Sequence, residues 1–336
     1  MVDVDSQIPG SINTSQDGCD MTIFNKLKNE IICCKEGVCY ILGEYNDKEA
    51  DKFEEDKTIK NIFPVEIETA FQPICDDNRA PIKYESLLRA SWEHPETKEK
   101  NYIRPDKYLE YLKIVSPEKY EKTILNVIKQ AVCFSSERKV PITLNFGTVE
   151  FSNDEYSSFL KQCCEYYGVQ TDMITIEILE EIPASKILKQ IGIDKLKDLA
   201  NKGFGLAIDD CYSNMYQKQG IKDMKALEEE AEAIEILLSE TSELIKVVKI
   251  DRKIVEHFFP EDGREISENQ LAKFMNNFGS KAFHGKQVIF EGVPKGRVNE
   301  VFAFFKEYLP KIDFLVQSYA TGEPEIPKKT NNNKES

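Results

Sequence analysis

The sequence lacks the features that would place it in a membrane or on a nucleic acid polymer. Its 336 residues contain no apolar run of about 18 residues, the length that a membrane-spanning helix needs. The first residues, MVDVDSQIPGSINTS, do not combine a basic end with an apolar segment, so no secretory signal is expected. The net charge of −15 argues against binding to DNA, RNA or an anionic membrane, because such binding needs clustered lysine and arginine. We therefore expect a cytoplasmic protein, whose charge still allows a small phosphate ligand if metal ions reverse it locally.

Cysteine and histidine motifs for zinc or for a catalytic triad are also missing. The nine cysteines are irregularly spaced and include no CxxC pair, and a group of them between residues 19 and 39 lacks the usual zinc spacing. The three histidines are scattered along the chain. Free thiols are therefore the expected state of the cysteines.

Length and composition describe an ordinary soluble globular protein. Hydrophobic residues make up 41% and charged residues 31% of a chain long enough for one large barrel or two modest domains. Residues 1–62 are polar and acidic, and they predict a partly flexible N-terminal extension with a hairpin that turns at Glu36-Gly37. Residues 323–336 predict a disordered tail.

Strand and helix patterns alternate along residues 63–322. The strand segments are nearly continuous apolar runs, which is typical of parallel strands buried on both faces. About eight strands over roughly 260 residues fit a closed (β/α)8 barrel better than an open sheet. The predicted fold is thus α/β, a modified TIM-type (β/α)8 barrel with a short N-terminal extension.

The stretch GFGLAIDD, from Gly203 to Asp210, is typical of a short buried strand that ends in two acids. Because successive strand residues point to opposite faces, the carboxylates of Asp209 and Asp210 are expected to diverge and to serve two partners. Adjacent acids at the rim of a core are costly unless a positive charge lies beside them, and a metal ion would supply it. A solvated turn or a helix cap is the alternative, since Asp also caps helices.

Polar residues interrupt the other apolar strands in the same way, toward the carboxyl ends where (β/α)8 barrels carry their chemistry. Carboxylate and amide oxygens suit Mg²⁺ or Mn²⁺, and Asp209 with Asp210 could bridge two ions about 4 Å apart. Lys249 beside such ions would have a lowered pKa and could orient or deprotonate a water molecule. Arg89 is a candidate clamp for a phosphate. The polar residues of the other strands are Glu85, Asn145, Glu177, Lys249, Glu291 and Gln317.

A series of short segments, taken in order, resembles the EAL-domain family of cyclic di-GMP phosphodiesterases. The segments are FQPI, YESLLR, TLN, IEILE, IDD, VKID, FEGV and LVQSY. Glu85-Ser86-Leu87 stands where the family has Glu-Ala-Leu, and the resemblance covers about residues 67–322. It implies a modified barrel that hydrolyses cyclic di-GMP to the linear dinucleotide pGpG with a metal-activated water.

The resemblance also implies roles for individual residues. Lys249 would act on the water, Glu291 would support the metals, and Gln317 would order the site. Gln72 and Arg89 would contact the nucleotide. A homodimer is also expected. The implied ligands of two Mg²⁺ or Mn²⁺ ions are Glu85, Asn145, Glu177, Asp209 and Asp210, and Glu180 would steady the loop that follows the acid pair.

Three departures from the family pattern leave a second interpretation open. The loop after the acids, Phe-Gly-Thr-Gly in the family, is Cys211-Tyr212-Ser213-Asn214 here, which cannot adopt the same backbone turns cheaply. Pro294 replaces the last Glu of the family's EGVE segment. The chain between Asp210 and Lys249 is about twice the usual length, with an inserted acidic helix at about 217–243. The alternative to an active phosphodiesterase is therefore a degenerate EAL domain that binds cyclic di-GMP or a protein partner.

Overall fold

The computed structural model of the protein describes ten stretches of the chain. They are 12–13, 21–25, 30–35, 38–44, 65–93, 98, 100–179, 192–211, 224–260 and 283–327. The chain divides into two compact units, one of Met1–Glu68 with Leu88–Thr123 and one of Thr69–Leu87 with Ile124–Ser336. The predicted C-terminal tail lies mostly outside the described residues.

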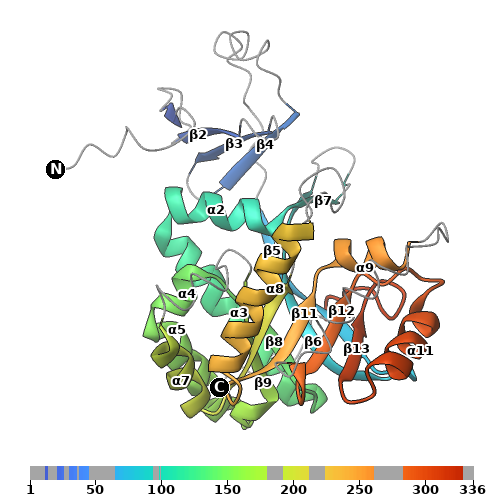
Figure 1. Ribbon diagram of the computed structural model, residues 1–336. Helices are drawn as coiled ribbons and strands as arrows, with labels where there is room; N and C mark the ends of the chain where they lie inside the picture. Colours follow the sequence, from blue (N-terminus) through green and yellow to red (C-terminus); the bar gives the residue numbers. More distant parts are fainter. Residues whose placement is uncertain are drawn as a thin grey trace. The chain divides into compact units, whose positions relative to one another are not determined.

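The first unit contains a small antiparallel sheet and a helix (Figure 1). The pairing of β3 with β4 confirms the hairpin expected at Glu36-Gly37. The carboxyl-terminal part of β6 pairs antiparallel with β7, with Ala90 opposite Ile103. The elements are β1 (Ile12–Asn13), β2 (Met21–Asn25), β3 (Glu30–Lys35), β4 (Val38–Glu44), β7 (Lys100–Ile103) and α2 (Pro105–Val115).

The second unit is organised around a closed eight-stranded barrel, which confirms the predicted fold. The strand order is β5-β13-β12-β11-β10-β9-β8-β6, and β6 pairs with β5 to close it. One expectation was wrong: β5 runs antiparallel to its neighbour β13, with Cys75 opposite Val316. The apolar pattern of a strand shows burial but not direction, so the sequence could not reveal this. The strands are β5 (Glu66–Cys75), β6 (Pro81–Glu93), β8 (Ile142–Phe146), β9 (Ile174–Ile178), β10 (Gly205–Cys211), β11 (Ile245–Ile250), β12 (Gln287–Glu291) and β13 (Asp313–Gln317).

Helices connect the parallel strands, and local signals set their ends. Asn153 caps α5 by accepting a hydrogen bond from Glu155 N at 3.0 Å, and Gly168 follows that helix with φ +67°. Gly203, at φ +94°, follows the C-cap residue Lys202 of α7. The helices are α3 (Pro117–Arg138), α4 (Thr148–Ser152), α5 (Asp154–Tyr167), α7 (Ile193–Asn201), α8 (Met224–Glu240), α9 (Arg252–Phe258) and α11 (Val298–Tyr308), with a 3₁₀ turn, η2 (Thr171–Met173).

Helix α8 lies within residues 217–243, where an inserted acidic helix is expected; the insertion itself stays a prediction. Its last turns bury Ile234, Leu237 and Leu238, the two leucines completely. The helix therefore connects β10 to β11 as part of the barrel. Its charged sequence concealed the few apolar positions that pack inward.

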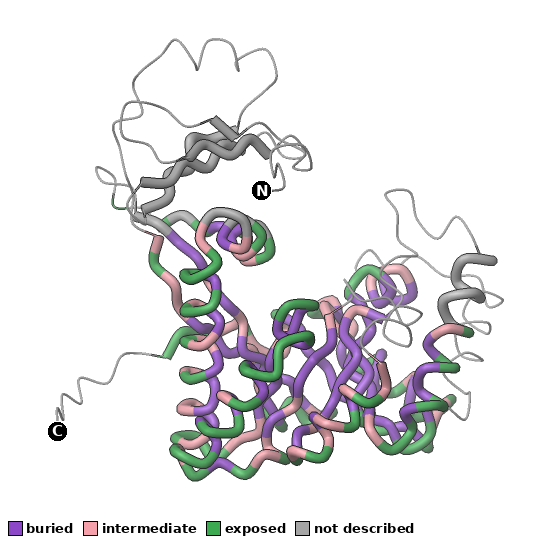
Figure 2. Tube along the Cα trace, turned by 90° about the vertical axis from the view of Figure 1, so that its left-hand side faces the viewer, coloured by how far each residue is buried: buried purple, intermediate pink, exposed green. Residues whose placement is uncertain are grey.

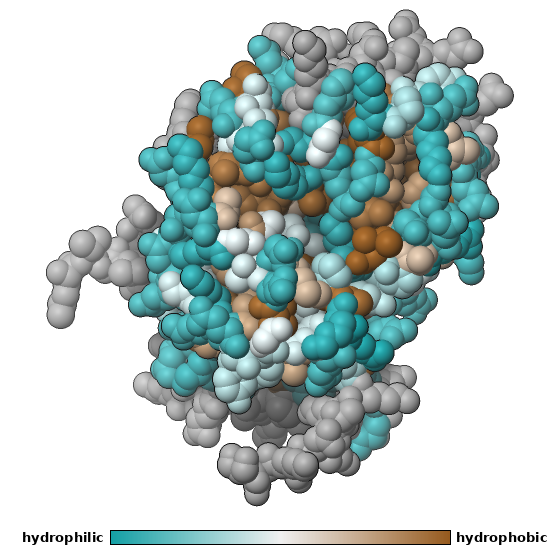
Figure 3. Space-filling view, turned by 90° about the horizontal axis from the view of Figure 1, so that it is seen from below, coloured by the Kyte–Doolittle hydropathy of each residue, from teal (hydrophilic) through white to brown (hydrophobic). Residues whose placement is uncertain are grey.

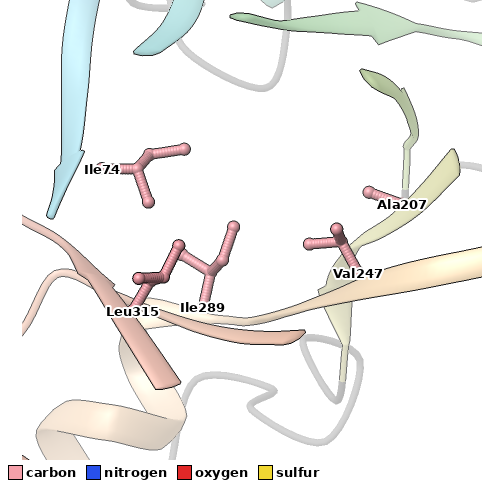
Figure 4. Packing of buried hydrophobic residues seen from close by; sticks show 5 residues of the cluster. All are labelled: Ile74, Ala207, Val247, Ile289 and Leu315. Atoms are coloured by element: carbon pink, nitrogen blue, oxygen red, sulfur yellow. The ribbon is translucent and has the colours of Figure 1, made fainter. Parts of the chain in front are cut away.

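The interior of the barrel has an apolar layer whose side chains point toward one another (Figure 4). It consists of Ile74, Ala207, Val247, Ile289 and Leu315, all at most 6% exposed. Buried residues follow the strands, and exposed ones lie on the outer sides of the helices (Figure 2).

Because side chains alternate between the two faces of a strand, the same strands also determine which residues lie next to this layer on its carboxyl-terminal side. Residues two positions further along a strand share its inward face, nearer the carboxyl end. On β10, β11, β12 and β13 these residues are Asp209, Lys249, Glu291 and Gln317. The apolar layer thus carries the polar residues on which the functional site is built.

The outer surface is mainly polar. Figure 3 shows the molecule from below, a face on which hydrophilic side chains surround smaller hydrophobic areas. None of the described helices combines the length and the apolar character that crossing a bilayer requires. Five cysteines lie in the described part of the second unit, and all five are free thiols, as expected.

Lys286 lies buried at the start of β12 and gives a stability prediction. Its Nζ donates to the carbonyl oxygens of Ser242 at 2.6 Å and Ile245 at 2.7 Å. Lys286→Met is expected to lower the free energy of unfolding by about 2 kcal/mol or more, because two carbonyls lose their charged donor. Lys246→Met, which removes an exposed partner of Glu243, should change the free energy of unfolding by less than about 1 kcal/mol. Urea denaturation measures both changes, and equal effects would contradict a stabilising role for the hydrogen bonds of Lys286.

Candidate active site

Lys249 stands at the centre of a buried cluster of carboxylates at the carboxyl ends of the barrel strands. Its Nζ lies 2.8 Å from Glu177, 2.9 Å from Asp209, 2.7 Å from Glu291 and 3.3 Å from Glu85. The lysine side chain is 1% exposed. Four strands, β6, β9, β10 and β12, thus direct an acid toward one ammonium on β11.

Amide side chains complete the cluster. Asn145 Nδ2 donates to Glu85 Oε1 at 2.7 Å. Gln317 Nε2 donates to Glu85 Oε2 and lies 3.4 Å from Gln72 Oε1. The network therefore fixes Glu85 from both sides and extends to β5.

Burial and mutual repulsion govern the charges of these acids. Burial raises the pKa of Glu177 and Glu291 well above the ordinary value; Lys249 opposes this shift, and neighbouring carboxylates add to it. Burial also raises the pKa of Asp209. For Glu85, attraction to Lys249 and hydrogen bonds from Gln317 and Asn145 outweigh burial and lower the pKa. The site thus places four buried carboxyl groups around one ammonium, and full ionisation of three of them is costly without further positive charge.

Without cations, Lys249 has a raised pKa, and the lowered pKa expected beside metal ions stays a prediction. Burial lowers the pKa of its ammonium, but the attraction of the four surrounding carboxylates outweighs burial and raises the pKa well above its usual range. The carboxylates alone therefore keep the ammonium charged, and Lys249 is a hydrogen-bond donor to the acids around it.

The acid pair at the end of β10 has a geometry that strand alternation does not predict. Asp210 has φ +46°, in the left-handed region, and the register with β11 shifts between Ile208 and Cys211. Asp210 N donates to Asp209 Oδ1 at 3.0 Å. The expected divergence of the two carboxylates was wrong, because this bulge brings both toward Glu291.

Two groups of carboxylate oxygens have the spacing of metal ligands. One contains Glu85, Glu177 and Asp209, and the other contains Asp209, Asp210 and Glu291; within each group, ligand oxygens lie within 4.8 Å of one another. Asp209 belongs to both groups. These hard oxygen donors suit Mg²⁺ or Mn²⁺ better than zinc.

Unpartnered buried oxygens support the fit to a metal. Among the described residues, no donor reaches Glu177 Oε1 or Asn145 Oδ1. A buried carboxylate or amide oxygen without a partner costs free energy, and a bound cation would remove that cost. Two observations therefore fit bound divalent cations: the set of oxygen donors, and the two buried oxygens without a partner.

Two neighbouring cavities open beside the cluster. The smaller, of about 260 Å³, is lined by most of the predicted site residues. The larger, of about 610 Å³, shares Arg252, Gly292, Ser318 and Tyr319 with it. Predicted site residues that line the smaller cavity are Gln72, Glu85, Asp209, Asp210, Lys249, Glu291 and Gln317.

Nothing in the described part of the second unit tests the roles predicted for Arg89 and Glu180. Arg89 belongs to the first unit, where its Nη1 donates to Leu88 O at 3.0 Å, and its contact with a nucleotide stays a prediction. Glu180 and positions 212–214 of the loop lie outside the described residues. The loop-stabilising role therefore also stays a prediction.

Sequence reasoning did not single out Arg252, Tyr319 or Lys83. Arg252 and Tyr319 follow strand ends, and that position was a usable signal. Lys83 is buried two residues before Glu85 on β6, where its Nζ donates to Gln287 Oε1. Burial lowers the pKa of Lys83. Its spacing from Glu85 already placed it on the inward face of the strand.

Comparisons with known proteins bear on the family and the fold. The family model described as EAL domain matches residues 62–222. A search of curated proteins gave no match. Lys249, Glu291 and Gln317 lie beyond the matched residues.

Solved structures share the fold at low sequence identity. A structure described as PaMucR phosphodiesterase in a c-di-GMP complex is 16% identical, with TM-score 0.55, 83% of this chain covered and 95% of that chain. The FimX EAL domain from Pseudomonas aeruginosa bound to c-di-GMP is 16% identical, with TM-score 0.52 and coverage of 77% and 90%. An EAL domain protein from Listeria monocytogenes EGD-e is 16% identical, with TM-score 0.52 and coverage of 78% and 89%. At such identity these likenesses show the fold alone. The resemblance to the EAL-domain family is thus confirmed for residues 62–222, the part of this chain that matches the family model.

Proposed function

We propose that this protein is a metal-dependent phosphodiesterase that hydrolyses cyclic di-GMP to linear pGpG. The observation that carries the proposal is the buried cluster in which four carboxylates surround Lys249 while Glu177 Oε1 stays unpartnered. Such an excess of buried acid is costly without cations. The family match and the c-di-GMP named in two structures of the same fold support this substrate.

The acids and Asn145 would hold two divalent cations. Glu85, Asn145, Glu177 and Asp209 would bind one, and Asp209, Asp210 and Glu291 would bind the other. Bound there, the ions would supply Lewis-acid stabilisation of the phosphate charge and lower the pKa of a water molecule. In the reaction, water oxygen bonds to phosphorus, one bond from phosphorus to a ribose oxygen breaks, and that oxygen takes a proton.

The chain's own residues would position the reactants. The protonated Lys249 would donate hydrogen bonds and orient the attacking water, and the four carboxylates around its ammonium favour this role over that of a base. Gln317 fixes Glu85 through its amide, and Gln72 and Arg89 would contact the nucleotide. The apolar layer beneath the cluster keeps bulk water away from its lower side.

Incubation of the purified protein with cyclic di-GMP and Mg²⁺ or Mn²⁺ tests the proposal. We expect linear pGpG by chromatography, and no product when EDTA removes the ions. Comparison of the two metals would identify the preferred ion. Absence of product with both ions would contradict the enzyme assignment.

A binding-only EAL domain is the second candidate, and Pro294 favours it. This residue replaces a family carboxylate and lines the larger cavity beside the cluster. Tight binding of cyclic di-GMP without linear product in the same assay would establish this alternative. The expected homodimer stays a prediction that sedimentation equilibrium would test.

A further inference from the structure

Arg252 lies where the two cavities beside the carboxylate cluster meet. It is the first residue of α9, directly after the β11 strand that carries Lys249. The side chain lines both the smaller cavity, with the acids, and the larger cavity, with Pro294 and Lys295. An extended ligand that occupies both cavities would therefore pass this guanidinium.

Gly292 makes room for this position. It follows Glu291 with φ +61°, and its N–H donates to Gln317 O at 2.8 Å. A Cβ at residue 292 would lie 2.2 Å from Arg252 Cγ and 2.6 Å from Cδ. The aliphatic part of Arg252 therefore packs directly against the backbone of Gly292, which ties the arginine to a strand end of the site.

The hydrogen bonds of Arg252 leave part of its guanidinium for a ligand. Nε lies 2.5 Å from Glu256 Oε1, one turn further along α9. Within the described part of the chain, this is the contact assigned to the guanidinium, whose side chain is 60% exposed. The fixed Nε orients the plane of the group, and two Nη nitrogens can donate to a phosphate in parallel.

Charge singles out Arg252 for an anionic ligand. Among the described residues that line the smaller cavity, the basic ones are Lys249 and Arg252. Lys249 is already surrounded by four carboxylates. Arg252 is thus the basic residue that both cavities share and that can approach a phosphate outside the acid cluster, while Lys295 lines the larger cavity.

We propose that Arg252 binds the second phosphodiester of a cyclic dinucleotide, the one that is not cleaved at the acid cluster. The inference rests on the proposed function, since it takes one phosphate to lie at the cluster and assigns the other to the junction of the cavities. Arg252 is then a substrate-binding residue that holds the ligand across both cavities.

Steady-state kinetics of matched variants test this assignment on two substrates. Cyclic di-GMP carries two phosphodiesters, whereas bis(p-nitrophenyl) phosphate carries one. With saturating Mn²⁺, Arg252→Ala is expected to raise KM for cyclic di-GMP by about tenfold or more, as for the loss of a charge-assisted hydrogen bond. Turnover at saturation and cleavage of bis(p-nitrophenyl) phosphate should stay within about threefold of the wild-type values.

Two further variants control for charge and geometry. Lys253→Ala removes one positive charge from the neighbouring exposed position and should leave both substrates unaffected. Arg252→Lys keeps the charge without the paired donors and should give an intermediate KM. An unchanged KM in Arg252→Ala, or equal losses on both substrates, would overturn the assignment.

The wild-type protein in the same experiment separates this inference from the proposed function. If it cleaves cyclic di-GMP and Arg252→Ala does so equally well, only the role of Arg252 fails. If it binds without cleaving, calorimetric titration with cyclic di-GMP and Ca²⁺ replaces the kinetics, and Arg252→Ala must bind about tenfold more weakly. If it neither binds nor cleaves, both assignments fall.

Discussion

Asp209→Asn is expected to abolish metal-dependent hydrolysis of cyclic di-GMP. Asp209 is the residue shared by both groups of carboxylate oxygens, so its loss weakens both cation sites together. Cations at such sites supply several kcal/mol of transition-state stabilisation, and we expect turnover to fall by at least about 10³-fold, or about 4 kcal/mol. Quantification of pGpG over time, at saturating Mn²⁺, measures the effect.

The fold should survive this change. Burial and Glu85 raise the pKa of Asp209. At a pH above the ordinary Asp pKa, keeping this carboxylate ionised therefore costs the folded protein free energy. A neutral Asn removes that cost, so the melting temperature in EDTA should rise or stay unchanged. Normal hydrolysis by a folded Asp209→Asn protein would show that the metal assignment is wrong.

Lys249→Met should abolish hydrolysis and also destabilise the protein in EDTA. The ammonium is the partner that four buried carboxylates share, at distances from 2.7 to 3.3 Å. Breaking a buried ion pair by removing one partner costs about 3–5 kcal/mol. Thermal unfolding in EDTA should therefore show a clear fall in melting temperature, opposite in sign to the effect of Asp209→Asn.

Added Mn²⁺ provides the control for Lys249→Met. Cations bound among the acids would replace the missing positive charge, so the melting temperature should recover as Mn²⁺ is titrated in. The wild-type protein should gain less, because Lys249 already offsets part of the repulsion. Equal stabilisation of both proteins by Mn²⁺ would contradict the idea that the lysine and the cations neutralise the same acids.

The fold and most of the cluster could be predicted because both follow from the sequence pattern of the barrel strands. Apolar residues mark the buried strands, and a polar residue toward the carboxyl end of a strand marks the face that carries the chemistry. This pattern predicted that Glu85, Glu177, Asp209, Lys249 and Glu291 lie together. Their contacts in the structure agree with it.

The remaining features depend on interactions that no linear pattern records. The bulge at Asp210 turns its carboxylate toward Glu291, and strand alternation alone gives the opposite direction. The pKa of Lys249 follows from four acids on four other strands. The position of Arg252 after a strand end was a sequence signal, whereas its packing against Gly292 is visible only in the structure.

The apolar layer inside the barrel has a kinetic consequence. Ile74, Ala207, Val247, Ile289 and Leu315 fill the interior directly beneath the acids. Ions and nucleotide would therefore reach the cluster from one side, through the same mouth. A bound nucleotide then obstructs the exit of the cations, so metal release measured with a chelator should slow in its presence. Entry would follow a fixed sequence, in which the cations load first and the nucleotide closes the site behind them.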